Sequence, residues 1–288
     1  MLDCGVWLSD KCSKRIRLKT KRKGVFCMEN RIYVANAAGE IKADLACQDE
    51  VILAWKGEYE VGDVINMEFA EPGYYMIRVD DCVDDALVYM TQKTLRYPVI
   101  FDEKKRAHNP KSFTGERHYI ALRPAHPWEL GYRNLAKNPA DQHEVEGCYP
   151  HASANVETRG ESVFAARNTI DGTMAVRSHG SWPYASWGIN KQDDAEFTLD
   201  FGRPVDFDTI VLYTRADFPH DNWWVQGTLT FSDGTTEVIE LTKSYAPQKF
   251  DIVRKRITWL KLGHLIKADD PSPFPALTQI EVYGTDSK

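Results

Sequence analysis

The sequence lacks any long apolar run: none of its 288 residues falls in a stretch of 18 apolar positions, so no transmembrane helix is expected. An excess of positive charge is also lacking: 36 Lys and Arg are outnumbered by 42 Asp and Glu, which gives a net charge of −6. That balance argues against general nucleic-acid binding, which usually needs a basic domain. Residues 1–15 carry Asp3 and Asp10 where a secretory signal would place positive charge and an apolar core. We therefore expect a cytoplasmic protein without a membrane partner.

Recognisable catalytic and zinc motifs are missing too. No GxSxG, HExxH, P-loop or GxGxxG signature stands in a supporting context, and no CxxC or Cys/His zinc spacing occurs. The sequence therefore assigns no catalytic residue. Cys148 stands alone in the later part of the chain. The other five cysteines fall in its first third: Cys4, Cys12, Cys27, Cys47 and Cys82. We interpret them as reduced, mostly buried thiols.

Convincing amphipathic helices are absent from residues 1–122, whereas short strand-like segments are abundant. Turn residues separate these segments, a pattern typical of an all-β sandwich or barrel. The expected strands are 25–28, 31–35, 41–46, 51–55, 64–69, 74–79, 86–90 and 118–122. The basic stretch 11–23 fits a half-buried strand with one charged face, although an anionic-membrane patch remains an alternative. Asp80, Asp81, Asp84 and Asp85 lack EF-hand spacing, and we interpret them as a solvated turn.

Residues 123–148 differ in composition from residues 1–122, because prolines recur among them. Pro124, Pro127 and Pro139 interrupt regular structure, and residues 128–136 could form two helical turns between them. The apolar side chains of that segment predict a connector that packs against one or both domains. Residues 149–288 would then form a second domain.

Alternation of apolar and polar residues predicts long strands in this second domain. It runs through residues 195–201 and 210–215, and again through 223–231 and 235–241. Ser232-Asp233-Gly234 separates the last two runs, a strong hairpin signal. Antiparallel two-sheet packing follows, so the fold class expected for the whole chain is all-β, with two β-sandwich domains.

The order of these pieces resembles the discoidin, or coagulation factor 5/8 type C, family of galactose-binding-like jelly rolls, which includes many carbohydrate-binding modules. The matching pieces are Ser153-Ala154, the Ala165 to Asp171-Gly172 loop, Phe197–Gly202, Ile210–Arg215, Ser232–Gly234 and Ile280–Gly284. The resemblance covers residues 149 to 286 and implies a jelly roll whose end loops bind ligands.

The resemblance also implies a structural Ca²⁺ ion between the Asp-Gly loop and a carboxylate of the last strand. Carried onto this sequence, the ligands would be Asp171, Thr173 with nearby carbonyls, and Glu281. Such oxygen donors suit a hard cation. An ordinary turn at Asp171-Gly172 with a surface Glu281 is the alternative.

Two loops of this domain concentrate aromatic and polar residues. A pyranose site needs a flat aromatic surface and a few fixed donors and acceptors, and both kinds occur here. The candidate ligand-binding residues are His179, Trp182, Tyr184, Arg215, Asp217, His220, Asp221, Asn222, Trp223 and Trp224. Trp223 and Trp224 would face opposite ways on a strand, so at least one should be buried, and Arg215 could simply pair with Asp217 or Asp221.

The function that these features favour is non-catalytic carbohydrate binding. The main alternative is a protein-interaction or assembly module in which the same loops bind a protein partner or a second copy of the chain. A sugar-processing enzyme is a further alternative, since His151, Glu157, Glu161, His179, His220 and Asp221 could act as acids or bases.

Overall fold

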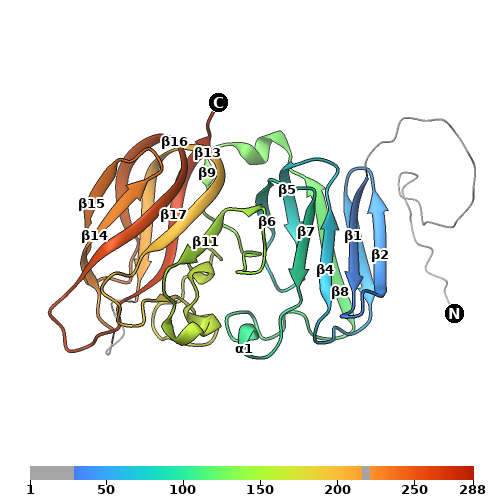
Figure 1. Cartoon of the computed structure of the whole chain (residues 1–288), viewed down its shortest axis with the longest axis horizontal. Coiled ribbons are helices and arrows are strands. Elements are labelled where there is room, and N and C mark those ends of the chain that lie inside the picture. The colour runs from blue at the N-terminus through green and yellow to red at the C-terminus, as the bar shows by residue number, and fades with distance from the viewer. Residues whose placement is uncertain (1–28, 216–220) are drawn as a thin grey trace, which may run out of the picture.

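The computed structural model describes residues 29–215 and 221–288, which form two β-rich halves side by side along the long axis of the molecule (Figure 1). The basic stretch 11–23, three of the cysteines, and the candidates Asp217 and His220 lie outside the described residues. Strands dominate both halves, which confirms the all-β class. None of the helices in the described ranges is long and apolar enough to cross a bilayer.

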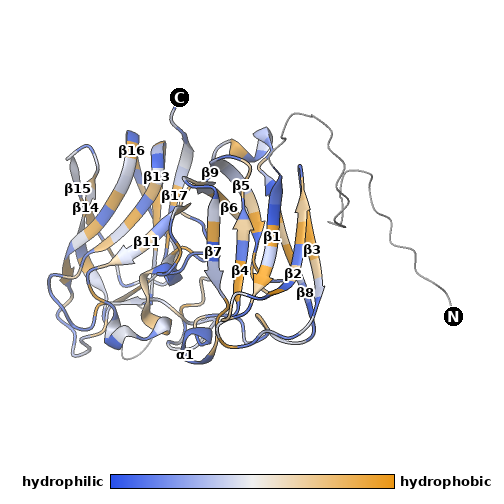
Figure 2. Cartoon of the chain, turned by 45° about the vertical axis from the view of Figure 1, so that its right-hand side comes forward, coloured by the Kyte–Doolittle hydropathy of each residue, from blue (hydrophilic) through white to orange (hydrophobic). Residues whose placement is uncertain are grey.

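The N-terminal half is a sandwich of two antiparallel sheets, with strand orders β2-β1-β4-β7 and β10-β6-β5-β8-β3. Along the strands apolar and polar residues alternate (Figure 2), so that one face of each sheet enters a shared core. The strands are β1 (Asn30–Ala35), β2 (Ile41–Cys47), β3 (Val51–Lys56), β4 (Val64–Glu68), β5 (Gly73–Arg78), β6 (Ala86–Met90), β7 (Thr94–Pro98), β8 (Arg117–Pro124) and β10 (Cys148–Tyr149). The alternation predicted six of these nearly to the residue, together with the central part of β8. It missed β7, β10 and the short helix α1 (Asp102–Lys105).

Two details of this half correct the sequence interpretation. Cys47 is disulfide-bonded, whereas Cys82 and Cys148 are free thiols. The interpretation as reduced thiols is therefore wrong for Cys47. Asp80 is buried rather than solvated, because it accepts hydrogen bonds from the backbone N–H groups of Cys82 and Phe113.

The connector contributes to both cores. Ala140, Val145 and Cys148 pack in the core of the N-terminal half, whereas Leu135 and Ala136 pack in that of the C-terminal half. The structure has the 3-10 helix η1 (Pro127–Leu130) where two helical turns were expected. The helix ends there because Gly131 has an extended backbone, and strand β9 (Arg133–Asn134) follows and pairs with the last strand.

The C-terminal half is a second antiparallel sandwich, with strand order β12-β17-β13-β16-β14-β15 and with β11 and β9 added at β13 and β17. Its strands are β11 (His151–Ala154), β12 (Trp187–Gly188), β13 (Phe197–Thr214), β14 (Trp224–Phe231), β15 (Thr236–Glu240), β16 (Gln248–Lys267) and β17 (Ala276–Asp286). Register shifts between Asp200 and Thr209 interrupt the β13–β16 pairing. Consequently β13 pairs with β11 through its first part and with β17 through its second part.

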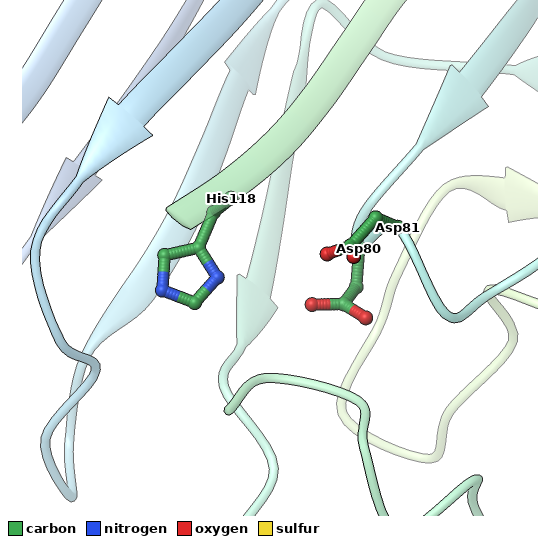
Figure 3. A group of neighbouring side chains, drawn as sticks. All are labelled: Asp80, Asp81 and His118. Atoms are coloured by element: carbon green, nitrogen blue, oxygen red, sulfur yellow. The ribbon is translucent and has the colours of Figure 1, made fainter. Parts of the chain in front are cut away.

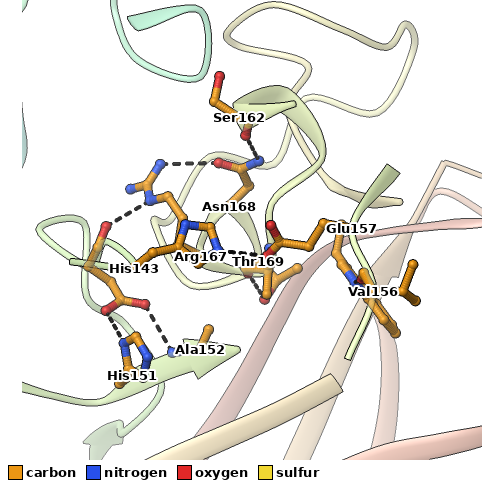
Figure 4. A network of polar contacts seen from close by, with 12 residues as sticks. His143, His151, Ala152, Val156, Glu157, Ser162, Arg167, Asn168 and Thr169 are labelled. Carbon is orange, nitrogen blue, oxygen red and sulfur yellow. Dashed lines mark hydrogen bonds and ion pairs between the residues drawn. The ribbon is translucent and has the colours of Figure 1, made fainter. Parts of the chain in front are cut away.

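A buried polar network fixes the connector to the loops of the C-terminal half (Figure 4). The carboxylate of Asp141 accepts hydrogen bonds from His151 Nδ1 at 2.7 Å and from the backbone N–H of Ala152 at 2.9 Å. Arg167, in the 3-10 helix η4 (Ala166–Thr169), donates from Nε to the carbonyl of Asp141 at 2.8 Å. Because these groups are buried, each bond satisfies atoms that would otherwise be costly to desolvate.

Further contacts join the two halves directly. Glu103, in α1, accepts hydrogen bonds from the backbone N–H and the hydroxyl of Ser162. The guanidinium of Arg203 lies 5.3 Å and 5.6 Å from the ring centres of Tyr74 and Tyr89. These contacts hold the two sandwiches in a fixed relation.

Candidate functional site

One end of the C-terminal sandwich contains a pocket of about 160 Å³. The loops before and after β12, between β13 and β14, and before β17 meet there, together with the 3-10 helix η2 (Thr158–Gly160). The lining residues are Thr158, Arg159, Phe164, His179, Gly188, Ile189, Asn190, Lys191, Arg215, Asp221, Pro273, Phe274, Pro275 and Ala276.

Arg215 and Asp221 provide the buried charges of this pocket. Each is only 3% exposed, and Arg215 Nε lies 3.4 Å from Asp221 Oδ2. Burial lowers the pKa of Arg215, and the nearby charge of Asp221 partly offsets that effect. Within the described residues, Arg215 Nε and Nη1 have no hydrogen-bond partner. Such donors are costly to bury, so a ligand that accepts hydrogen bonds from them is favoured.

Aromatic rings and further cations complete the walls. Phe274 is 43% exposed, and the Lys191 ammonium lies 4.9 Å from its ring centre. In η2, the guanidinium of Arg159 lies 5.5 Å from the ring centre of Phe164. The pocket therefore combines an exposed aromatic face with several hydrogen-bond donors.

Close backbone packing shapes the floor of the pocket. Gly188 approaches Thr158 so closely that an added Cβ would lie 2.7 Å from the threonine hydroxyl. The same hydroxyl accepts a hydrogen bond from the backbone N–H of Asn190 at 2.9 Å. Asn190 and Lys191 both have positive φ angles, 49° and 62°, which turn the chain sharply beside the pocket.

The structure brings together three of the residues predicted from sequence: His179, Arg215 and Asp221. Trp224 is a correction, because it is 1% exposed and packs against Trp187 in the core. The later buried residues of β14 are odd-numbered, and a register shift between Trp224 and Gln226 lets Trp224 face the same core.

Four other candidates lie away from the pocket. Asn222 is buried, and its side-chain amide donates to the carbonyls of Ala268 and Ser272, so it braces a loop. Trp223 is half-buried beneath the ammonium of Lys243 at 4.7 Å. Trp182 turns toward the N-terminal half, where its backbone N–H donates to the carbonyl of Arg106 at 2.7 Å, and Tyr184 follows it in the same loop. None of these four lines the pocket.

Sequence reasoning missed Phe274, Lys191 and Arg159. Phe274 stands between two prolines in the segment 271–275, and an aromatic residue held in so rigid and polar a loop was the available signal. Lys191 and Arg159 come from separate loops, and only the fold brings them together.

The predicted calcium ligands occupy a different place from the pocket. Asp171 Oδ1 accepts a hydrogen bond from the backbone N–H of Thr173 at 2.7 Å, and Asp171 Oδ2 lies 3.7 Å from Arg167 Nη1. The Lys137 ammonium also stands beside this loop, 3.3 Å from where a Cβ on Gly172 would lie. Two protein cations thus already balance the Asp171 carboxylate.

The last strand contributes a neutral group to that loop. Gln279 Oε1 accepts a hydrogen bond from the backbone N–H of Gly172 at 3.2 Å. The Glu281 carboxylate instead accepts hydrogen bonds from the hydroxyls of Tyr213 and Tyr283 at 3.2 and 3.3 Å. A calcium ion needs several anionic or carbonyl oxygens and no adjacent cations, so this set of residues does not fit it.

Comparison with known proteins places this geometry in context. Residues 149–268 match the family described as "Domain of unknown function (DUF7402)". No curated protein matches the sequence. Among solved structures, the chain is similar to the lectin binding domain of lectinolysin complexed with Lewis b, with 17% identity, a TM-score of 0.40, and coverage of 53% of this chain and 96% of that one.

Two further similar structures are carbohydrate-binding modules. A fucose binding module of Streptococcus pneumoniae has 13% identity and a TM-score of 0.38, over 54% of this chain and 99% of that one. The family 32 module of Clostridium perfringens NanJ, solved in complex with galactose, has 15% identity and a TM-score of 0.35, over 46% of this chain and 91% of that one.

Proposed function

We propose that the C-terminal sandwich binds a carbohydrate without transforming it, in the pocket lined by Arg215, Asp221, His179 and Phe274. The observation that carries the proposal is the buried guanidinium of Arg215, whose Nε and Nη1 have no hydrogen-bond partner among the described residues. Vicinal hydroxyls present neutral acceptors and donors at the spacing that a guanidinium and a carboxylate can share.

Phe274 supports the same ligand class. A pyranose ring has an apolar C–H face that stacks on an aromatic side chain, and Phe274 leaves much of its ring exposed at the pocket mouth. Arg215 and Asp221 would then bind the hydroxyls of the sugar, while Lys191 and Asn190 lie at the rim. The discoidin-like resemblance of residues 149–286 agrees with a ligand at this end of the fold.

The carboxylates considered for catalysis have structural partners instead. Glu157 accepts hydrogen bonds from His143 Nε2 at 2.9 Å and from the backbone N–H of Ala166 at 2.8 Å. Glu161 pairs with Arg159, and His151 pairs with Asp141. These contacts hold loops in place, which favours the binding function over the sugar-processing alternative.

A glycan array on the full chain tests the proposal, with fucose, galactose and Lewis b sugars among the probes. Phe274→Ala should abolish the signals of the wild-type chain, because the stacking surface is removed. Tyr245→Ala is the matched control, since Tyr245 is 42% exposed on the same half but does not line the pocket. Equal signals from the Phe274→Ala and wild-type chains would refute the site. If the wild type binds no glycan on the array, the protein-interaction alternative is favoured instead.

A further inference from the structure

A second site stands in the N-terminal half, where two carboxylates face a histidine (Figure 3). Asp80 and Asp81 follow the end of β5, and His118 is the second residue of β8. These strands are antiparallel neighbours in which Arg78 pairs with Ala121. The last residues of β5 and the first residues of β8 therefore lie at the same end of the sheet. One ligand atom from each of the three side chains lies within 4.8 Å of the other two.

One ring nitrogen of the histidine already has a hydrogen-bond partner, which leaves the other for a ligand. His118 is 4% exposed, and its Nε2 lies 3.0 Å from the carbonyl oxygen of Gly57. Because a carbonyl only accepts, Nε2 is the donor to Gly57, so Nδ1 is the nitrogen that a metal ion would use. Nδ1 is buried and has no hydrogen-bond partner among the described residues. A backbone carbonyl on one ring nitrogen and a metal ion on the other is the common arrangement for ligating histidines.

Asp80 is equally fixed. Its Oδ1 accepts a hydrogen bond from the backbone N–H of Cys82 at 2.8 Å, and its Oδ2 accepts one from the backbone N–H of Phe113 at 2.9 Å. Each oxygen keeps a second lone pair, so the carboxylate is oriented but still able to coordinate. Asp81 is exposed and free to adjust toward an ion.

A neighbouring hydroxyl adds an independent indication. The Tyr59 ring packs 4.3 Å from the His118 ring, and its buried hydroxyl also has no hydrogen-bond partner in the described part of the chain. Buried polar atoms usually have a hydrogen-bond partner, and a cation bound beside the two carboxylates would give these two atoms one.

We infer that Asp80, Asp81 and His118 bind one divalent transition-metal ion, with Zn²⁺ as the best match. In tetrahedral geometry, Zn–N and Zn–O bonds of about 2.0–2.2 Å place two ligand atoms about 3.3–3.6 Å apart, so side-chain rotations must bring these three atoms closer than their present spacing of up to 4.8 Å. The imidazole nitrogen favours zinc over calcium, which prefers oxygen ligands alone. The ion would join the end of β5 to the start of β8 and, through Gly57, to the end of β3. The exposed side of Asp81 leaves room for water as a further ligand.

Isothermal titration of the chelator-treated full chain with ZnCl₂ tests this inference, together with the melting temperature with and without the ion. The wild type should bind one Zn²⁺ that Asp81→Asn weakens by at least about tenfold, and this ion should raise the melting temperature. Asp84→Asn removes the same charge from the same loop and serves as the matched control, with affinity unchanged. Because Asp81 is exposed, its substitution should leave the apo protein folded.

A second variant addresses the histidine. In His118→Gln the side-chain amide can still donate to the carbonyl of Gly57, while the Nδ1 lone pair is lost. This variant should fold and lose the same Zn²⁺ equivalent. The inference is overturned if no Zn²⁺, Mn²⁺ or Co²⁺ binds to the wild type, or if Asp81→Asn binds zinc as tightly as Asp84→Asn does. The latter result would place the ion elsewhere in the chain.

Discussion

Arg215 Nε lies 3.4 Å from Asp221 Oδ2, and both side chains are almost wholly buried at the end of the C-terminal sandwich. A buried ion pair is weak evidence of stabilisation, because desolvation of both charges offsets much of their attraction. Its place in a pocket with an exposed aromatic ring is better explained by a polar ligand.

The first prediction concerns this pair. Arg215→Met should lower the free energy of unfolding by about 3–5 kcal/mol, because it leaves the carboxylate of Asp221 buried without its cation. Urea unfolding measures the effect. The double variant Arg215→Met with Asp221→Leu should recover much of the loss while remaining unable to bind sugar. A double variant no more stable than the single one would contradict the explanation.

The second prediction concerns pH. The hydrogen bond to Asp141 raises the pKa of His151, with burial acting against it. A folded-state pKa above the unfolded value gives stabilisation that is fully present below the unfolded pKa, near 6.5, and is lost as pH rises through the folded value. The melting temperature of the wild type should therefore fall as pH rises from slightly acidic to mildly alkaline.

His151→Gln provides the control for that pH dependence. The amide can still donate to Asp141 but does not titrate, so the decline over this interval should become shallower. His143, whose pKa is raised by Glu157, contributes with the same sign and should leave a residual slope. An unchanged pH profile in His151→Gln would show that this pair is not responsible.

The third prediction concerns calcium. Since Lys137 and Arg167 already surround Asp171, about 1 mM Ca²⁺, the upper range for extracellular modules, should leave the melting temperature unchanged. Differential scanning calorimetry with Ca²⁺ and with chelator measures this. A clear Ca²⁺-dependent rise that Asp171→Asn removes would restore the calcium site implied by the family resemblance.

The fourth prediction concerns the disulfide at Cys47. Reduction should destabilise the chain by about 2–5 kcal/mol, as is typical for native disulfides in small domains. Non-reducing peptide mapping should recover the Cys47 peptide linked to a second cysteine. Disulfides are typical of oxidising compartments, so the cytoplasmic location stays a prediction that this mapping on protein from its native source would test. Recovery of Cys47 only as a free thiol would contradict the bond.

Much of the fold was predictable because alternation along a strand directly reflects which face is buried. This is why β4, β6 and β14 appeared at nearly their observed bounds. The site was harder to predict from the sequence, because Phe274, Lys191 and Arg215 come from three loops that only the fold brings together. The burial of Asp80 was missed for a related reason: its backbone partner Phe113 lies 33 residues away. Local sequence also gave no sign that Lys137 stands beside Gly172.

The measurement that tests the central claim most directly is isothermal titration of the strongest array sugar into the wild type, Phe274→Ala and Tyr245→Ala. Burying a Phe side chain contributes about 1.5–3 kcal/mol, so Phe274→Ala should bind about tenfold or more weakly at an unchanged melting temperature. Tyr245→Ala should bind like the wild type. Equal affinities for all three proteins would contradict the account and place the ligand outside this pocket.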